Sequence, residues 1–335
     1  MSLIRKILLP FVPFYYLVTW WRNVFYDTEV FSSKSYDFPV ICVGNLSVGG
    51  TGKTPMIEYL IRLLRGRRIA TLSRGYKRKT KGFVLASGNM TASDIGDEPF
   101  QFYNKFKDVL VSVDESRQNG ISNLMKLEEA SPEVILLDDA YQHRKVKAGL
   151  NILLTLYDNR YSKDICLPTG NLREPRNGAN RAHIVVVTKC PHDLDVNEKT
   201  NIQKELNLGD DQELFFSTIK YADSIYSVSE ENPISFLSNK DITLVTGIAN
   251  PKPLLDYLND KGLTYEHLNF KDHHDFTEKE VELLNSKSFV LTTEKDFMRL
   301  KDKVNNQNLY YLPIEVTIDR GESFNKLILD FTANN

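Results

Sequence analysis

Residues 39–55 read PVICVGNLSVGGTGKTP, an apolar run that leads into a glycine-rich turn and ends in Gly52-Lys53-Thr54. Backbone N–H groups in such a turn, together with the positive end of a following helix, bind anions, while the lysine and the hydroxyl reach terminal phosphates and Mg²⁺. The apolar residues before the turn form a buried-strand run, and those after it recur at helical spacing. The stretch therefore predicts a P-loop that binds ATP.

One position departs from the usual pattern G-x-x-x-x-G-K-[ST]. Ser47 stands where the first glycine is expected, while Gly49 and Gly50 keep the turn flexible. The alternative is a glycine-rich turn with a chance lysine, and the patterns on either side argue against it. The residues expected to bind the nucleotide are Ser47, Val48, Gly49, Gly50, Thr51, Gly52, Lys53 and Thr54.

Length and composition indicate a folded protein with a sizeable core. The chain has 335 residues, of which 41% are hydrophobic and 26% charged, enough for two domains. Cys42, Cys166 and Cys190 are scattered without metal-ligand spacing. They are expected to be buried small hydrophobic residues in a reducing compartment rather than disulfides or zinc ligands.

The net charge of −2 conceals a basic segment at residues 59–93, which holds nine lysines and arginines and no acidic residue. Such a segment predicts a face that attracts anions, either lipid headgroups or a phosphorylated substrate. Nucleic acid is not expected, because interleaved aromatic residues and a nucleic-acid motif are missing. A solvated helix end and loop is the alternative.

The N-terminal residues 7–21, ILLPFVPFYYLVTWW, carry no charge. Fifteen residues fall short of the roughly 20 that a helix needs to cross a bilayer, and Pro10 and Pro13 interrupt them. Flanking basic residues and the aromatic side chains fit a helix that lies in the membrane interface. A cleaved signal peptide is one alternative, but no small-x-small cleavage site follows the segment, and an ATP site belongs in the cytoplasm. An apolar helix that docks on the protein's own core is the other alternative.

Strand and helix patterns alternate along the chain, which is typical of an α/β protein with a parallel sheet. We expect a P-loop NTPase-like parallel sheet domain, a second, smaller α/β domain and an N-terminal membrane-interface helix. The expected divisions are residues 1–25 for the membrane-associated segment, 26–157 for the P-loop kinase domain and 158–308 for the second α/β domain. Residues 309–335 form a C-terminal strand and tail that can return to the first domain. The expected strands are 69–73, 109–113, 134–139, 151–155, 184–188, 214–220, 242–246, 288–292 and 309–312, and the expected later helices are 116–128, 253–259 and 277–284.

A second element of phosphoryl-transfer chemistry follows the apolar run 135–137, where Asp138 and Asp139 end the strand as in a Walker B motif. Successive strand residues face opposite sides, so one carboxylate can enter the Mg²⁺ shell with Thr54 while the other serves a neighbour or the nucleophile. An acidic pair that merely ends a strand in a turn is the alternative.

Four further clusters are dense in reactive polar groups: GDEP at 96–99, QHR at 142–144, LREP at 172–175 and FKDHH at 270–274. The last places a carboxylate beside two imidazoles, where a proton relay could be built. Each cluster alone is more often a solvated turn, but their number favours a functional site.

Taken in order behind the aromatic N-terminal segment, the motifs resemble those of the tetraacyldisaccharide 4'-kinase family, the lipid A 4'-kinases of outer-membrane biogenesis. The motifs are GNLSVGGTGKTP, LSRGY, GDEP, LLDDAYQH, LPTGNLREP, VTGIANP, FKDHHDF and TTEKD. The resemblance runs to about Asp296, and this set is far more specific than the P-loop alone.

The resemblance implies a monotopic or peripheral enzyme at the cytoplasmic face of the bacterial inner membrane. Such an enzyme transfers the γ-phosphate of ATP to the 4'-hydroxyl of a tetraacylated glucosamine disaccharide 1-phosphate, with ATP and Mg²⁺ as cofactors. The implied partners are this lipid and the membrane surface. We expect a monomer and no nucleic acid.

Site roles also follow from the resemblance. Lys53 and Thr54 match the phosphate and Mg²⁺ ligands, Asp97 matches the base that takes the hydroxyl proton, and His273 matches the residue that assists it. Asp138 and Asp139 match the metal-side acids, Asp139 being counted with Lys53 among the catalytic residues. The positions expected around the substrate are Arg117, Gln142, Arg173, Glu174 and, on weaker grounds, Tyr76.

Two positions depart from the family pattern. Ala140 stands where many members have glycine after the acids, which affects the turn that places Gln142, and Lys271 stands where proline is frequent.

Three other functional classes were compared with the kinase. A regulatory GTPase would continue Thr188-Lys189 into an aspartate, but Pro191 holds that position. A membrane-positioning ATPase would need a lysine at Val48. A lipid-binding scaffold would not need to keep Lys53, Thr54 and the acid pair. A membrane-associated regulatory P-loop NTPase without a lipid acceptor is the main alternative.

Overall fold

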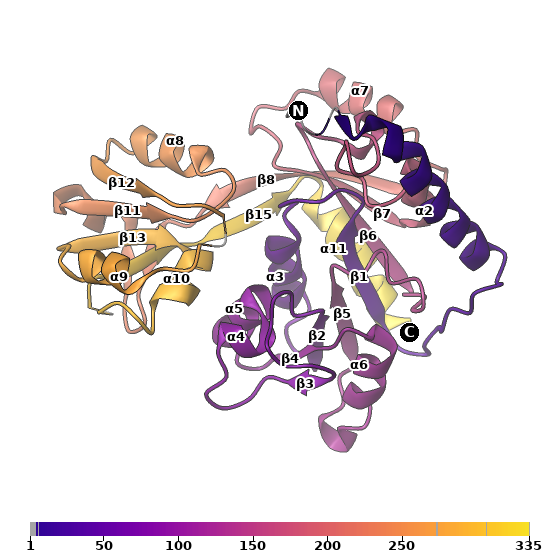
Figure 1. The fold of residues 1–335 in the computed structure, drawn as a ribbon, viewed down its shortest axis with the longest axis horizontal. Coiled ribbons are helices and arrows are strands. Elements are labelled where there is room, and N and C mark those ends of the chain that lie inside the picture. Colours follow the sequence, from indigo (N-terminus) through magenta and orange to yellow (C-terminus); the bar gives the residue numbers. More distant parts are fainter. Residues whose placement is uncertain (1–4, 6, 273, 306, 335) are drawn as a thin grey trace.

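Two β-sheets organise the molecule (Figure 1), a computed structural model that describes residue 5 and residues 7–272, 274–305 and 307–334. The larger sheet has the strand order β15-β8-β7-β6-β1-β5-β2-β4-β3. The smaller has the order β10-β9-β14-β13-β11-β12. The strands of the larger sheet are β1 (Val40–Asn45), β2 (Ile69–Ser73), β3 (Val84–Leu85), β4 (Leu110–Val113), β5 (Val134–Asp138), β6 (Leu150–Leu156), β7 (Ile184–Thr188), β8 (Glu213–Tyr221) and β15 (Ile314–Ile318).

The centre of the larger sheet is parallel. β1 pairs in parallel with β5 on one side and β6 on the other, with Val43 beside Asp138 and Ile152. The carboxyl ends of these strands therefore lie at one edge of the sheet, where ligands bind in open α/β folds. The two edge strands of this sheet are antiparallel to their neighbours: β3 pairs with β4, and β15 pairs with β8.

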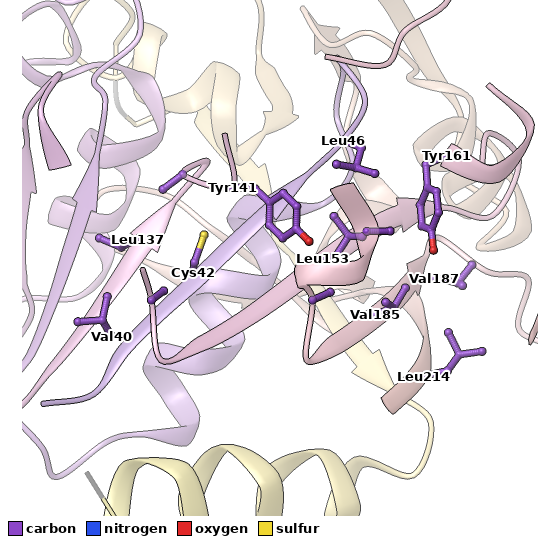
Figure 2. Packing of buried hydrophobic residues seen from close by; sticks show 14 of the residues in the cluster. Val40, Cys42, Leu46, Leu137, Tyr141, Leu153, Tyr161, Val185, Val187 and Leu214 are labelled. Atoms are coloured by element: carbon purple, nitrogen blue, oxygen red, sulfur yellow. The ribbon is translucent and has the colours of Figure 1, made fainter. Parts of the chain in front are cut away.

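Side chains of the central strands alternate between two hydrophobic layers, because successive residues face opposite sides of a sheet. Cys42 and Leu153 belong to one layer, with Tyr141 packed over them (Figure 2). Ile41 and Ile152 belong to the other. Burial on both faces explains the uninterrupted apolar runs in the sequence. The three cysteines are buried and free, as expected.

Helices cover both faces of the larger sheet. The layer around Ile41 is covered by α3 (Lys53–Leu63), α5 (Asp97–Lys105) and α11 (Gly321–Ala333). The layer around Cys42 is covered by α6 (Arg117–Leu124) and α7 (Val196–Leu206), with α2 (Val12–Asp27) at its margin. Short elements beside them are η1 (Leu9–Phe11), α4 (Ala92–Ile95), η2 (Glu128–Ala130), η3 (Tyr161–Lys163) and η4 (Arg176–Arg181).

The smaller sheet lies at one side of the molecule (Figure 1), where β8 leads into it and β15 leads back to the larger sheet. Its strands β14, β13, β11 and β12 are parallel, and β9 and β10 add an antiparallel edge. The strands are β9 (Ser224–Tyr226), β10 (Glu231–Pro233), β11 (Ile242–Thr246), β12 (Tyr265–Asn269), β13 (Phe289–Thr293) and β14 (Leu309–Leu312). The accompanying helices are η5 (Ile234–Asn239), α8 (Lys252–Asp260), α9 (Glu278–Asn285) and α10 (Glu294–Leu300).

A shared hydrophobic cluster joins the two sheets. Ile95 and Phe100 from α4 and α5 belong to the same cluster as Phe297 and Leu300 from α10. The second sheet therefore packs on the larger unit beside α5.

The change from one sheet to the other differs from the sequence expectation. β7 and β8 follow residue 158, where we placed the start of the second domain, yet both belong to the larger sheet. The reason is that β6, β7 and β8 continue the parallel pairing without interruption. The change comes after Tyr221, and β15 brings the chain back to the larger sheet.

Candidate active site

The glycine-rich loop lies at the carboxyl edge of the larger sheet, between the last residue of β1 and the first residue of α3. Gly52 has φ +89°, a left-handed conformation that glycine adopts without strain, and α3 begins at Lys53. The Asn45 amide donates to the Thr51 hydroxyl (2.7 Å), and the Thr188 hydroxyl donates to the Thr51 carbonyl (2.8 Å). β1 and β7 thus hold the end of the loop that leads into the helix.

The outer half of the loop is open. A Cβ atom added to Gly49 or Gly50 would meet nothing within 4 Å, and Gly49 has φ +114°. Ser47, which replaces the expected glycine, is bridged to Leu172, and the Val48 amide donates to the Asn171 carbonyl (2.8 Å). Backbone pairing with the LREP segment therefore supports the loop at this position, where a serine fits as well as glycine.

The two acidic residues after the apolar strand point to different neighbours. Asp139 has φ +48°, which turns the chain out of the strand direction after Asp138. Its carboxylate accepts hydrogen bonds from Arg173 (3.0 Å) and lies 3.7 Å from the Lys53 ammonium. Burial alone would raise the pKa of Asp139, but Lys53 and Arg173 outweigh it and hold the pKa below its ordinary value.

Asp138 lies beneath this ion pair. Its Oδ2 accepts a hydrogen bond from Ser73 (3.2 Å), whereas its Oδ1 is buried without a hydrogen-bond partner. Burial raises the pKa of Asp138 to about 6 against the opposing charge of Lys53, with Asp139 and Glu98 adding to the rise. A cation at this edge would satisfy the orphaned oxygen, so the donor set fits Mg²⁺.

No cluster of three metal-binding side chains occurs in the part of the chain that the structure describes. Mg²⁺ in nucleotide sites takes one or two carboxylates and fills its other positions with phosphate oxygens and water. Two carboxylates and the Thr54 hydroxyl at the start of α3 meet that requirement.

Arg173 and Glu174 connect the acid pair to the N-terminal helix. The Gln142 amide donates to the Asn45 carbonyl (2.8 Å) and to Glu174 (3.0 Å), and Arg173 donates to Gln142 (3.4 Å). Glu174 is fully buried and also accepts from Asn23 of α2 (2.7 Å). The structure thus brings Gln142, Arg173 and Glu174 together, and their network reaches from the loop to α2.

The GDEP motif begins a helix rather than forming a loop. Asp97 and Glu98 occupy the first turn of α5, where a helix N-terminus favours carboxylates. Glu98 lies near enough to Asp138 to raise the pKa of that carboxyl. Asp97 accepts hydrogen bonds from Arg299 of α10. The motif therefore faces both the acid pair and the smaller sheet, while His273 lies outside the described residues.

Two expected substrate residues have other surroundings. Arg117 is 2% exposed, and its guanidinium donates to the carbonyls of Asp114 (2.7 Å) and Asp138 (3.2 Å), so it fixes the end of β5 from below. Tyr76 is 65% exposed in the segment after β2, where Lys77 lies over its ring. Arg117 therefore contacts the acid pair at the backbone carbonyl of Asp138.

The basic segment does not form one continuous face. Arg62 pairs with Glu58 and Arg68 with Glu133 near the start of β2, at the edge of the sheet opposite the loop. Arg78 pairs with Glu115. The basic segment crosses the sheet as β2. Of its residues, those after Ser73 therefore lie at the carboxyl edge, where the glycine-rich loop is.

Sequence reasoning missed Asn45, Ser73 and Thr188 as parts of the site. Each is polar and ends an apolar strand, which is the signal that could have identified them, because carboxyl ends of parallel strands meet at one edge. Arg299 gave no local signal, since it lies far from Asp97 in the sequence.

The N-terminal helix α2 carries opposite faces. Phe14 and Val18 are 73% and 69% exposed, whereas Thr19 and Asn23 are buried. The Tyr15 hydroxyl donates to the Arg173 carbonyl (2.8 Å). Within residues 5, 7–272, 274–305 and 307–334, we find no helix with both the length and the apolar character needed to cross a bilayer.

Comparisons with known proteins agree with this arrangement. The family described as tetraacyldisaccharide-1-P 4'-kinase matches residues 4–333. A Flavobacterium johnsoniae tetraacyldisaccharide 4'-kinase is 52% identical over 100% of this chain and 99% of its own. A Bacteroides thetaiotaomicron tetraacyldisaccharide 4'-kinase is 45% identical over 99% of this chain and 94% of its own.

A solved structure is similar along the whole chain. It is the crystal structure of the "apo" form of LpxK from Aquifex aeolicus in complex with ATP, with a TM-score of 0.80 and 33% identity. The match covers 98% of this chain and 100% of that one. The chain belongs to the tetraacyldisaccharide-1-P 4'-kinase family.

Proposed function

We propose that this protein is a kinase that transfers the γ-phosphate of ATP to the 4'-hydroxyl of a tetraacylated glucosamine disaccharide 1-phosphate. One observation carries the proposal: the open glycine-rich loop and the ion pair of Lys53 with Asp139 lie at one sheet edge, where Glu98, next to Asp97 in the first turn of α5, acts on Asp138. The names of the full-length relatives supply the substrate class.

The phosphates of ATP would lie along residues 47–54, with backbone N–H groups and Lys53 as donors. Asp138, Asp139 and Thr54 would hold Mg²⁺, which neutralises charge on the phosphate oxygens during transfer. The orphaned Oδ1 of Asp138 supports this assignment. Lys53 already pairs with Asp139, so it is positioned before the nucleotide arrives.

Transfer would proceed by attack of the sugar 4'-oxygen on the γ-phosphorus. The new O–P bond forms as the bond from that phosphorus to the β,γ-bridging oxygen breaks, and ADP leaves. Asp97 accepts the hydroxyl proton, which is the role of a positioned carboxylate in alcohol activation. His273 is proposed to assist Asp97.

The substrate headgroup would bind beside the acid pair. Arg173 is a half-buried cation there, oriented by Asp139, while Gln142 and Glu174 hold the segment that carries it. Arg117 supports this surface from beneath by fixing the acid pair. Tyr76, exposed at the same edge, would contact the sugar from the basic segment after β2.

We propose that the protein is a peripheral or monotopic monomer at the cytoplasmic face of the bacterial inner membrane, and the exposed apolar side chains of α2 support the membrane contact. A cavity of about 520 Å³ lies between α2 and the cis Leu167-Pro168 segment. Its walls are the apolar side chains of Phe11, Phe14 and Val18, which suit acyl chains. The sheet membership supports two domains, with the phosphate site on the nine-stranded unit.

The proposal is tested with γ-labelled ATP, Mg²⁺ and either the disaccharide lipid or a protein acceptor. We expect label in the lipid alone and loss of transfer by at least about a thousandfold in Lys53→Ala, because the γ-phosphate loses its cation. Lys252→Ala, which removes an exposed lysine of α8, is the matched control. Release of labelled phosphate without lipid labelling would favour the regulatory NTPase instead.

A further inference from the structure

Helix α10 carries three charged side chains that contact α5. Lys295 pairs with Glu98 (3.3 Å), and Glu294 pairs with Lys105 (2.7 Å). Arg299 donates from Nε to Asp97 Oδ2 (3.2 Å), and its Nη2 donates to the same oxygen. Helix α10 of the smaller sheet thus contacts both ends of α5, the helix that begins with the proposed base Asp97.

Arg299 is itself held from behind by a buried carboxylate. Asp296 is fully buried and accepts from Arg299 Nη1 (3.2 Å). Its other oxygen accepts from the Gly247 amide (2.8 Å) and the Thr293 hydroxyl (2.8 Å). The carboxylate therefore has donors on several sides, which fixes the direction in which Arg299 extends.

The close approach to Gly247 explains why glycine is needed there. A Cβ at this position would come within 2.9 Å of Asp296 Oδ1. The VTGIANP and TTEKD motifs, to which the proposed function gives no role, thus meet at Asp296.

We propose that Arg299 is a positioning residue for Asp97, contributed by the smaller sheet and oriented by Asp296. This inference rests on the proposed function, in which Asp97 accepts the proton of the acceptor hydroxyl. Two N–H donors of one rigid, planar guanidinium converge on Oδ2 of Asp97 and fix the place of that oxygen. The Nε and Nη2 bonds of Arg299 reach Oδ2, so neither of these bonds has to break when a proton is taken at Oδ1.

The arrangement makes base orientation depend on how the two units pack. The guanidinium comes from the smaller sheet and the carboxylate from the larger unit, and Phe297 and Phe100 share the hydrophobic cluster between them. A displacement of α10 would therefore move Arg299 away from Asp97 while leaving residues 47–54 unchanged. Catalysis would be affected, and nucleotide binding would not.

The test is a kinetic comparison of Arg299→Gln with the wild-type enzyme, using the disaccharide lipid and γ-labelled ATP. We expect kcat to fall by about tenfold to a hundredfold, the range for misplacement of a catalytic group, with KM for ATP unchanged. Arg299→Lys keeps the charge but loses the fork, so its kcat should lie between the two. Lys303→Gln removes an exposed lysine that pairs with Asp275 just beyond α10, and it should match the wild type.

A double variant separates positioning from general stability. If Arg299 acts through Asp97, Arg299→Gln should lower the residual kcat of Asp97→Asn by no more than about twofold, because the effects are not independent. If the ion pair were purely structural, the losses of kcat in the two single variants would multiply in the double variant, and its melting temperature would fall. Multiplying losses, an unchanged kcat in Arg299→Gln or a matching rise in KM for ATP would overturn the proposal.

If Arg299→Gln does not fold, Arg299→Lys decides, since wild-type kcat in that variant would contradict a role for the fork. A wild-type enzyme that labels no lipid would remove the proposed function itself. An active wild type with an inert Arg299 substitution would remove this inference alone.

Discussion

Two helices that flank the glycine-rich loop bury opposite kinds of surface. α3 packs Met56, Ile57, Leu60 and Ile61 into the core and begins with the phosphate-binding lysine. α2 buries Thr19 and Asn23 instead and leaves Phe14 and Val18 outside. The hydrophobic core thus holds α3, whereas buried polar contacts, with Val12 and Tyr15 at the margin of the core, hold α2 and leave Phe14 and Val18 exposed.

The difference matches the two materials that a lipid kinase has to bring together. A phosphate site needs a helix terminus that does not move, and α3 is fixed along its length by the sheet. A lipid acceptor comes from a membrane, and a helix with an outward apolar face can rest in its interface.

The largest expected effect on stability concerns the core of α3. Leu60→Ala should lower the free energy of unfolding by about 2–5 kcal/mol, because Leu60 is fully buried and its loss leaves a cavity. Phe14→Ala on α2 should change it by less than about 0.5 kcal/mol. Chemical denaturation measures both, and equal losses would show that α2 is held by its apolar residues after all.

A smaller effect is expected where α2 meets the site. Asn23→Ala removes one donor from the fully buried Glu174, which keeps Gln142 and Arg181 as partners. The cost should be about 1–3 kcal/mol, the penalty for an under-satisfied buried acceptor. Asn201→Ala on the exposed face of α7 is the matched control, and a similar small change in both variants would contradict polar docking of α2.

The polar side of α3 gives a pH-dependent effect. Glu58 shares Lys105 with Glu294 of α10, and burial, followed by the charge of Glu58, raises the pKa of Glu294 to about 7. The folded state then holds a proton that the unfolded state has lost. The stabilisation from this raised pKa is complete below the ordinary glutamate pKa and disappears as the pH rises through about 7.

Glu294→Gln removes this titration. Its stability relative to the wild type should therefore rise by about 1 kcal/mol or more between pH 5 and pH 8. Thermal unfolding at both pH values measures the difference, with Glu282→Gln on the exposed side of α9 as control. If the difference in stability between Glu294→Gln and the wild type stayed constant across this pH range, the raised pKa of Glu294 beside Glu58 and Lys105 would be contradicted.

The smallest effect on stability is expected at the outward face of α2. Phe14→Ser with Val18→Ser should leave unfolding nearly unchanged but weaken binding to anionic lipid vesicles by about tenfold, because apolar area leaves the interface. Vesicle sedimentation measures binding. Undiminished sedimentation would assign membrane contact to another surface, and deletion of residues 1–21 should move the protein to the soluble fraction.

Much of the fold was predictable because buried strands leave a plain signal. The strands 69–73, 184–188, 242–246 and 309–312 were predicted with the bounds that the structure has. The capping box of Thr277 and Glu280 also marked the start of α9. The strand β12, half-buried and mixed in polarity, was missed because neither face is uniformly apolar.

The site was predictable only in its local parts. Residues 47–54 and the acid pair are contiguous motifs, and the structure brings them together through parallel pairing of β1 with β5. Asp97 was predicted in a turn but begins α5, because the charged segment GDEP hides a helix start. Its contact with Arg299 depends on the packing of α10 against α5, which no local pattern records.

Proton acceptance by Asp97 requires that the nucleotide held by Lys53 lie within reach of its carboxylate. Measurement of lipid phosphorylation and Mg·ATP affinity in Asp97→Ala tests this requirement. We predict loss of transfer with nearly unchanged affinity, since only proton acceptance and acceptor positioning are removed. A comparable loss of nucleotide affinity would assign Asp97 to the metal site and contradict its role as the base.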